Sequence, residues 1–245
     1  MSEDNNLIIT NELVKRLSFT DVNRLKFGAV VVDAGVGGNK YGNAHMKVNV
    51  QDGKKKTYDF DRYREMFGER MLKDDLYLGY YLHLVQDALY RNYVYDRYHW
   101  NPVLPRNVER LHKDYEIINQ YVINKYGLMN DLIVPDRFED EALNQISAFD
   151  TKGLMQDMSS YFLPVDEEPI FFFTKEMSDE FIEEAMEFCV DEFKVFYQSV
   201  MKPAYDAQYP DEMQSDSRAA VDIDLNGSEG VLKLVDFVRQ WLGAN

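Results

Sequence analysis

Residues 76–90 read LYLGYYLHLVQDALY, and this stretch decides the fold class of the chain. Its aromatic side chains recur at helical spacing, which favours a buried core helix over a lipid-binding or base-stacking surface. We expect Asp74 or Asp75 to cap this helix, which continues to about residue 98. His83 and Asp87 are four residues apart, so both side chains project from one face of the helix.

Helical patterns also dominate on both sides of this stretch, so the sequence predicts an all-α fold, a multi-helix bundle. A small β-hairpin is expected near residues 46–58, because alternating valines precede Asp52-Gly53, a dipeptide that suits a type I′ turn. We predict a single helical domain over residues 1–245, with a helical C-terminal extension over about 127–245. The other predicted helices run from Thr10 or Asn11 to Leu17, from a Thr20 cap to Gly35, from Asp59 or Asp61 to residue 72, and over 107–126, 136–148, 151–162, Ser178–Met201 (which Pro203 stops) and 228–242.

Composition excludes several classes of partner and site. The formal net charge is −16, which argues against nucleic acid and anionic membrane surfaces as main partners. No segment approaches the roughly 18 uninterrupted apolar residues of a membrane span, and the start of the chain lacks the features of a secretory signal, so we expect a cytoplasmic location. Cys189 is the only cysteine, so an intrachain disulfide is impossible, and its helical surroundings predict a buried, inert thiol.

All four histidines of the chain fall between residues 45 and 112, in one ordered series with three carboxylates. Histidine and carboxylate side chains together form sites for zinc-like metals. The series contains two pairs with a four-residue step, and each pair can hold one ion from a single helix face. Taken singly, each member also has an ordinary explanation as a surface pair, a helix terminator or a loop residue. The candidate metal ligands are Asp33, His45, His83, Asp87, His99, His112 and Glu116.

The order of these residues resembles the zinc-dependent phospholipase C family, whose fold is shared with the S1/P1-type nucleases, and in particular its intracellular bacterial members. LYLGYYLHLVQDALY is similar to the family's core helix, an LGY followed by His-x3-Asp, and FGAVVVDAG (27–35) to its helix ending in a metal-binding aspartate. The resemblance covers roughly residues 9–120 and implies a metal-binding helical core over about 9–126, with up to three zinc ions. It implies one zinc ion held by Asp33, His45, His83 and Asp87, and a second held by His99, His112 and Glu116, with Asp87 able to bridge the two.

Two departures from the family pattern reduce the expected number of zinc ions from three to two. Asn11 stands in Ile9-Thr10-Asn11, at the place where the family has a histidine that helps to bind the third metal. The mature N-terminal tryptophan of the secreted enzymes also has no counterpart in this chain.

The resemblance implies a metal-dependent hydrolase, a phosphoesterase acting on a small phosphate ester or a lipid-headgroup-like substrate. Two metal ions suit in-line displacement at phosphorus, because they activate a water molecule and stabilise charge on the attacking and leaving oxygens. Asp33 is the candidate catalytic residue, since it could bind metal and also orient or deprotonate the water. Two other interpretations stay open. One is a catalytically degenerate metal-binding scaffold or interaction protein of the same fold, and the other is a helical binding module whose histidines cluster by coincidence.

Two further motifs are given structural interpretations. Asp222, Asp224 and Asn226 imitate the start of an EF-hand loop, but Lys233 occupies the twelfth position, where calcium requires a bidentate glutamate. The Lys54–Lys56 run is expected to form the solvated tip of the hairpin, with steering of an anionic substrate as the alternative.

Overall fold

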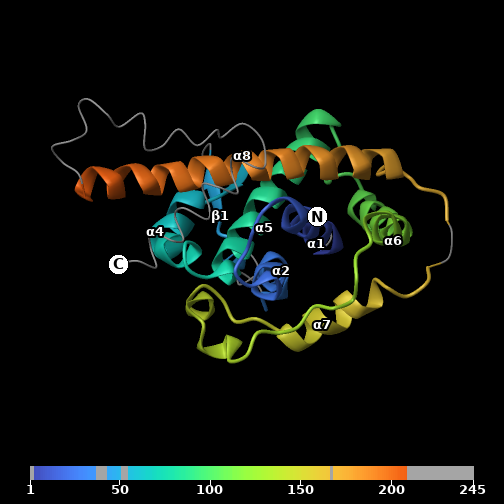
Figure 1. The fold of residues 1–245 in the computed structure, drawn as a ribbon. Helices are drawn as coiled ribbons and strands as arrows, with labels where there is room; N and C mark the ends of the chain where they lie inside the picture. Colours follow the sequence, from blue (N-terminus) through green and yellow to red (C-terminus); the bar gives the residue numbers. More distant parts are fainter. Residues whose placement is uncertain (1–2, 37–42, 51–54, 166–167, 209–245) are drawn as a thin grey trace.

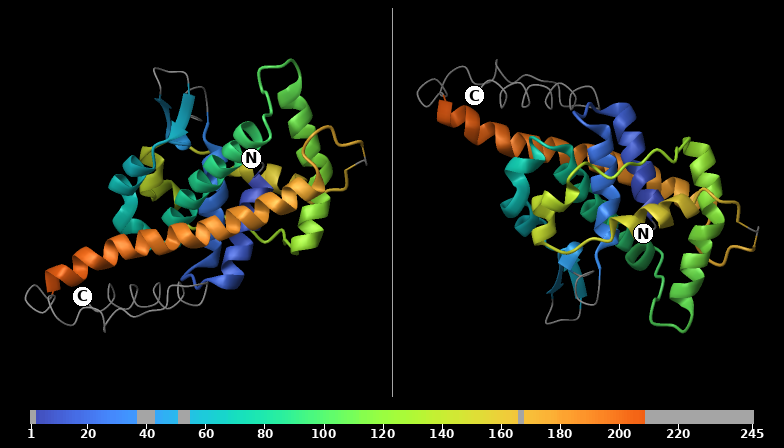
Figure 2. Two further views of the ribbon diagram at one scale, coloured as in Figure 1. Left: turned by 90° about the horizontal axis from the view of Figure 1, so that it is seen from above. Right: turned by 90° about the horizontal axis from the view of Figure 1, so that it is seen from below.

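A computed structural model describes residues 3–36, 43–50, 55–165 and 168–208 of the chain. The described part is all-α apart from one two-stranded antiparallel hairpin, which confirms the predicted fold class. Helix α5 (Asp75–Arg91) runs through the middle of the molecule, in contact with α1 (Glu3–Arg16), α2 (Val22–Val31), α4 (Phe60–Met71) and α8 (Lys175–Gln208) (Figure 1). Figure 2 shows α8 crossing the bundle from the side of α6 (Asn107–Tyr126) to the side of α4.

Helix α5 is the core helix that the sequence predicts. The carboxylate of Asp74 accepts a hydrogen bond from the Leu76 backbone N–H at 3.0 Å, so Asp74 is the N-cap. Nearly every side chain from Asp75 to Asp87 is buried, because other helices surround α5. After Arg91 the chain continues as a π-helical segment, Asn92–Arg97, so regular α-helix ends earlier than the predicted residue 98.

Helices α2 and α5 cross at two glycines, and this crossing sets the geometry of the region around His83. A Cβ atom at Gly28 would lie 2.1 Å from the Leu76 carbonyl oxygen, and one at Gly79 would lie 2.0 Å from the Leu25 carbonyl oxygen. Neither position therefore has room for a side chain. His83 lies one turn after Gly79, so the close approach brings it directly against α2.

The hairpin consists of β1 (Lys47–Val50) and β2 (Lys55–Tyr58), paired from Lys47 with Tyr58 to Val50 with Lys55. Its position confirms the prediction for residues 46–58, while Asp52-Gly53 and Lys54 lie outside the described residues. Asp59 follows β2 and caps α4 by accepting from the Arg62 N–H. Asp59 therefore connects the end of β2 directly to the start of α4.

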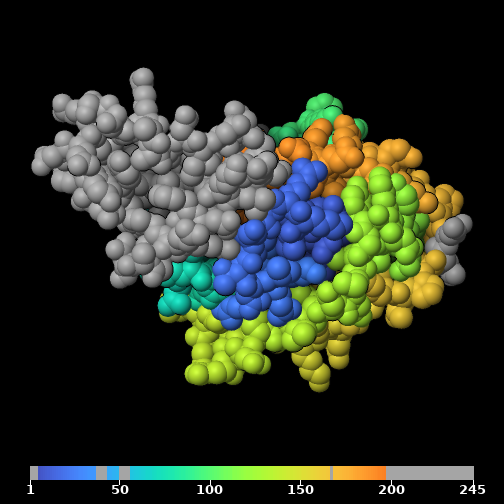
Figure 3. Space-filling model, viewed as in Figure 1, coloured from blue at the N-terminus to red at the C-terminus, as the bar shows by residue number. Residues whose placement is uncertain are grey.

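Residues beyond α6 (Asn107–Tyr126) add to the same hydrophobic core as the first half of the chain. One continuous buried cluster contains Leu7 and Phe27 as well as Phe138, Phe173 and Phe193. Figure 3 shows that residues 3–36 (blue) reach the surface between the α6 region (green) and the α4 region (teal). Within the described residues, no helix combines the length and apolar character that crossing a bilayer demands.

The predicted helix over 136–148 is wrong. The chain forms two short 3₁₀ turns there, Phe138–Asp140 and Ala142–Gln145, separated by Glu141 in an extended conformation. Tertiary contacts explain the difference, because the Glu141 carboxylate accepts hydrogen bonds from Arg24 at 2.6 Å and from the Tyr77 hydroxyl at 2.8 Å. The next helix, α7 (Thr151–Ser160), agrees with the prediction and is capped by Asp150.

Several predicted helix ends also differ from the structure. Helix α1 begins at Glu3 rather than at Thr10 or Asn11, because the buried run Leu7–Ile9 gains more from packing than its neighbouring asparagines lose in helix propensity. Asp21, not Thr20, caps α2 by accepting from the Arg24 N–H. Helix α8 begins at Lys175 and continues past Pro203 to Gln208, because a helix can bridge a proline by losing one backbone hydrogen bond.

The remaining predictions concern Cys189 and the segments after residue 208. The Cys189 side chain is fully buried as predicted, and burial raises the pKa of its thiol to about 12. The predicted helix over 228–242 and the discounted calcium loop at 222–233 lie outside the described residues.

Asp114 on α6 binds the backbone of residues 171–173, which lead into α8. Its two carboxylate oxygens accept from the backbone N–H groups of Phe171, Phe172 and Phe173 at 2.7–2.8 Å, and the side chain is buried. We expect Asp114→Ala to destabilise the protein by about 3 kcal/mol or more, because several buried N–H groups lose a charged acceptor. Thermal denaturation checks this. Asp157→Ala, at an exposed position of α7, is the control, and equal melting temperatures for both variants would contradict the assignment.

Candidate metal centre

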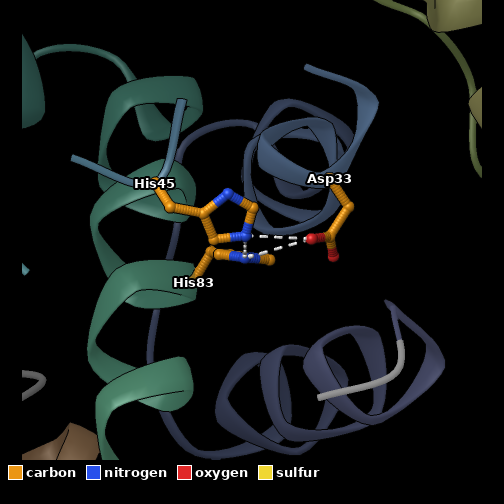
Figure 4. Close-up of side chains that lie close together, drawn as sticks. All are labelled: Asp33, His45 and His83. Carbon is orange, nitrogen blue, oxygen red and sulfur yellow. Dashed lines mark hydrogen bonds and ion pairs between the residues drawn. The ribbon is translucent and has the colours of Figure 1, made fainter. Parts of the chain in front are cut away.

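Three candidate ligands meet at one buried point, and each comes from a different element (Figure 4). Asp33 lies in the 3₁₀ turn Val32–Ala34 that ends α2, His45 precedes β1, and His83 is on α5. His45 Nε2 lies 3.0 Å from Asp33 Oδ1 and 3.4 Å from His83 Nε2, while His83 Nε2 lies 3.8 Å from Asp33 Oδ1. Both imidazoles are fully buried.

Asp87 completes the group as a fourth side chain. Its Oδ2 atom lies 3.5 Å from His45 Nε2 and 3.7 Å from His83 Nε2. The four-residue step from His83 places Asp87 on the same face of α5, as the sequence predicts. The Tyr58 hydroxyl, at the end of β2, donates a hydrogen bond to Asp87 Oδ2 at 3.2 Å and so orients the carboxylate.

The spacing of Asp33, His45 and His83 fits the coordination of one tetrahedral ion, and Asp87 lies at similar distances from the two imidazoles. With metal–ligand distances of about 2.0–2.1 Å, two ligands of a tetrahedral ion are separated by about 3.3 Å. The five separations given above run from 3.0 to 3.8 Å and bracket that value. Among the described residues, Asp33, His45 and His83 form a buried group whose ligand atoms all lie within 4.8 Å of one another and could hold a metal ion, and Asp87 Oδ2 lies close to the two imidazoles of this group.

The tautomer of His83 also suits metal binding. Its Nδ1 atom lies 2.8 Å from the Ala29 carbonyl oxygen, in the last turn of α2. A carbonyl can only accept, so Nδ1 carries the proton and Nε2 keeps its lone pair directed at Asp33 and His45. Metal-binding histidines are typically oriented by such a hydrogen bond from the second ring nitrogen.

Asn6 of α1 supports the same nitrogen of His83. Its Nδ2 atom lies 3.0 Å from His83 Nδ1, while its Oδ1 atom is buried without a hydrogen-bond partner. Rotating the amide by 180° exchanges the two atoms, so that Oδ1 accepts from the protonated Nδ1. We assign this orientation because the single Nδ1–H of His83 is then shared between two acceptors, Asn6 Oδ1 and the Ala29 carbonyl oxygen. Three helices therefore position one imidazole.

The electrostatics of the group keep both carboxylates ionised. Burial opposes ionisation of Asp33, but the neighbouring imidazoles of His83 and His45 lower its pKa below the ordinary value. Burial likewise opposes ionisation of Asp87, and electrostatic interactions with His83, His45 and Lys47 bring its pKa well below the ordinary value. Two ionised carboxylates beside two buried imidazoles could hold a divalent cation.

A pocket of about 410 Å³ opens from this group towards the surface. Asp33 and Asp87 form part of its wall, whereas the two histidines lie behind them. The other lining residues are mostly aromatic or basic: Lys47, Tyr58, Tyr90, Arg91, Tyr95, Val108, Leu111, His112, Tyr115, Glu116, Asn119 and Tyr161. Its volume falls within the range of small-molecule sites.

The remaining predicted ligands do not join the group. His112 and Glu116 line the same pocket from α6 but are exposed, and Glu116 pairs with Lys113 at 3.3 Å. His99 is exposed in the turn after the π-helical segment, with a left-handed backbone (φ 56°). Asn11, at the place of the family's histidine, forms no hydrogen bond to a ligand. Among the described residues, the structure thus brings together one group of metal ligands.

Comparisons with known proteins leave the family of the chain open. A scan against protein-family models, a search of curated proteins and a search of solved structures each find no match. The likeness to zinc-dependent phospholipases C therefore stays a prediction. Functional conclusions depend on the geometry of the site.

Sequence reasoning missed several residues of the site. Asn6 and Tyr58 hold the ligands, and Lys47 and Arg91 lie beside them in the pocket. Arg91 stands one turn after Asp87 on the predicted helix, a spacing that could have indicated its place. Asn6 and Tyr58 come from distant elements, and no spacing in the sequence relates them to His83 or Asp87.

The contact of Asn6 with His83 leads to a prediction for metal affinity. We expect Asn6→Leu to lower the affinity for zinc roughly 10–100-fold, because His83 loses a partner that fixes its ring and tautomer. Competition with a chromogenic chelator measures the change. Asn11→Leu, on the same helix, is the matched control. Equal zinc affinities for the two variants would show that Asn6 does not act on the site.

Proposed function

We propose that the protein is a metal-dependent hydrolase of small phosphate esters, with one zinc ion held by Asp33, His45, His83 and Asp87. The observation that carries this proposal is the buried group of Asp33, His45 and His83, whose donor atoms lie 3.0–3.8 Å apart, beside a pocket of about 410 Å³. Asp87 Oδ2 lies 3.5 and 3.7 Å from the two imidazoles of this group. Two imidazole nitrogens and two carboxylate oxygens favour zinc among the divalent ions that bind in tetrahedral geometry.

The chemistry of the pocket supports hydrolysis rather than a purely structural metal. A divalent ion in a pocket lowers the pKa of a bound water and stabilises negative charge on phosphoryl oxygens. Asp33 and Asp87 border the pocket, so substrate has access to the ligand group from that side. Asp33 is the proposed residue that orients or deprotonates the attacking water, because its carboxylate reaches both the histidines and the pocket.

Metal analysis followed by activity measurements tests the proposal. Protein prepared without chelator is expected to contain zinc and to hydrolyse members of a panel of phosphate monoesters and diesters. Chelation should abolish turnover, and added zinc should restore it. Turnover that survives complete removal of metal would refute the proposal.

A second candidate function is a metal-binding scaffold without catalysis. The observation that favours it is that His99, His112 and Glu116 lie apart from the group of Asp33, His45 and His83. The described residues therefore offer a site for one metal ion, whereas the sequence predicts two ions. A protein that binds zinc through Asp33, His45, His83 and Asp87 but turns over no ester of the panel would support this candidate.

A further inference from the structure

We infer that Lys47 and Arg91 form an anion-binding subsite of the pocket, which takes the phosphate group of a small soluble ester. This inference rests on the proposed function and names the residues that recognise its substrate. Both side chains line the pocket that also contains Asp33 and Asp87.

Local structure places the two cations on the wall beside the ligands. Arg91 lies one turn after Asp87 on α5, and both side chains therefore point to the same side of the helix. Its guanidinium carbon lies 5.3 Å from the centre of the Tyr95 ring, which holds the side chain by a cation–π contact. Lys47 is the first residue of β1, two positions after His45, and its ammonium group lies 5.8 Å from the centre of the Tyr58 ring.

The ion pairs of the molecule distinguish Arg91 from other arginines. Arg24 and Arg97 each form ion pairs with two carboxylates. Among the described residues, Arg91 forms no ion pair with any carboxylate, although the chain has 43 acidic residues and 27 lysines and arginines. A guanidinium kept in a pocket in this way presents its forked donors to a ligand, and that fork matches the geometry of phosphate oxygens.

The charge balance explains why the subsite needs the metal. With neutral His112, the side chains that line the pocket carry a formal charge of −1, from three carboxylates and two cations. One divalent ion changes this value to +1. The loaded pocket therefore attracts a phosphate anion, whereas the metal-free pocket repels it. Within a protein of net charge −16, this attraction is local and favours a small ligand over a polymer or a charged surface.

Titration of the zinc-loaded, full-length protein with inorganic phosphate tests the subsite by calorimetry. We expect Arg91→Gln and Lys47→Gln each to weaken phosphate binding about tenfold or more, as for loss of a charged hydrogen-bond donor. Zinc content and melting temperature should stay unchanged, because neither residue is a ligand. Arg62→Gln and Lys73→Gln, exposed positions on or next to α4, remove the same charges outside the pocket and should leave phosphate affinity unchanged.

The outcomes separate the subsite from the proposed function. Unchanged phosphate affinity in both pocket variants, with zinc retained, overturns the subsite and leaves the hydrolase proposal standing. A chain that binds no zinc overturns both. Vesicles containing phosphatidic acid distinguish a lipid headgroup from a soluble ester. Binding to such vesicles that is tighter than binding to phosphate, and that Arg91→Gln removes, would overturn the assignment to a small soluble ligand.

Discussion

His83→Ala is expected to yield a folded protein without bound zinc, whereas the wild-type chain prepared in parallel carries about one zinc ion. His83 contributes the most constrained ligand of the group, since Ala29 and Asn6 both contact its Nδ1 atom. Its removal leaves three donors, of which two are carboxylates on the pocket wall. We expect zinc affinity to fall more than about 100-fold. Loss of a ligand should have a larger effect than loss of a residue, such as Asn6, that only orients a ligand. Asp87→Ala should act in the same direction.

His112→Ala is the matched control for the loss of an imidazole. His112 lies across the same pocket on α6 but outside the ligand group, so this variant should keep its zinc. Metal content by mass spectrometry, after removal of loosely bound ions, measures both variants. Full retention of zinc by a His83→Ala, Asp87→Ala double variant would show that the metal binds elsewhere.

Gly79→Ala is expected to destabilise the protein strongly. The added Cβ would lie 2.0 Å from the Leu25 carbonyl oxygen and 3.0 Å from the Ala29 nitrogen, both backbone atoms of α2. Backbone atoms cannot rotate away, so the two helices must separate. We expect a loss of about 3 kcal/mol or more in the free energy of unfolding, at the upper end for overpacked cores. Zinc affinity should fall as well, because His83 then moves away from Asp33.

Gly68→Ala provides the control, since it makes the same change inside α4. No atom lies within 4 Å of a Cβ added at Gly68. We expect this variant to be more stable than wild type by roughly 0.5–1 kcal/mol, the usual gain for alanine over glycine in a helix. Denaturant unfolding compares the variants. A Gly79→Ala protein as stable as the Gly68→Ala protein would contradict the close packing of α2 and α5.

The sequence was sufficient to predict most of the long helices and the residues that meet in the buried group, because both depend on local spacing. The four-residue step from His83 to Asp87 and the position of Asp33 at the end of α2 are properties of single helices. The helix over 107–126 could be predicted for the same reason, since Gly127 stops it in a left-handed conformation.

Contacts between distant segments could not be predicted in this way. The 136–148 segment has a helical pattern, but Glu141 is held by Arg24 and Tyr77 from other helices. His112 and Glu116 have the same spacing as the His83 pair, yet α6 turns them to an exposed wall of the pocket. Spacing on one helix shows which side chains share a face, and the packing of the bundle decides what that face meets.

The glycine crossing has a consequence for finding relatives of this chain. Neither Gly28 nor Gly79 touches the ligand group, yet a side chain at either position would keep the ligands apart. Homologues that retain the site should therefore keep both glycines, or replace both of them together. The diagnostic signature is then Gly-x4-Asp on one helix and Gly-x3-His-x3-Asp on another, which Gly28 to Asp33 and Gly79 to Asp87 represent in this chain. A search with both halves would select for the helix contact as well as for the metal donors.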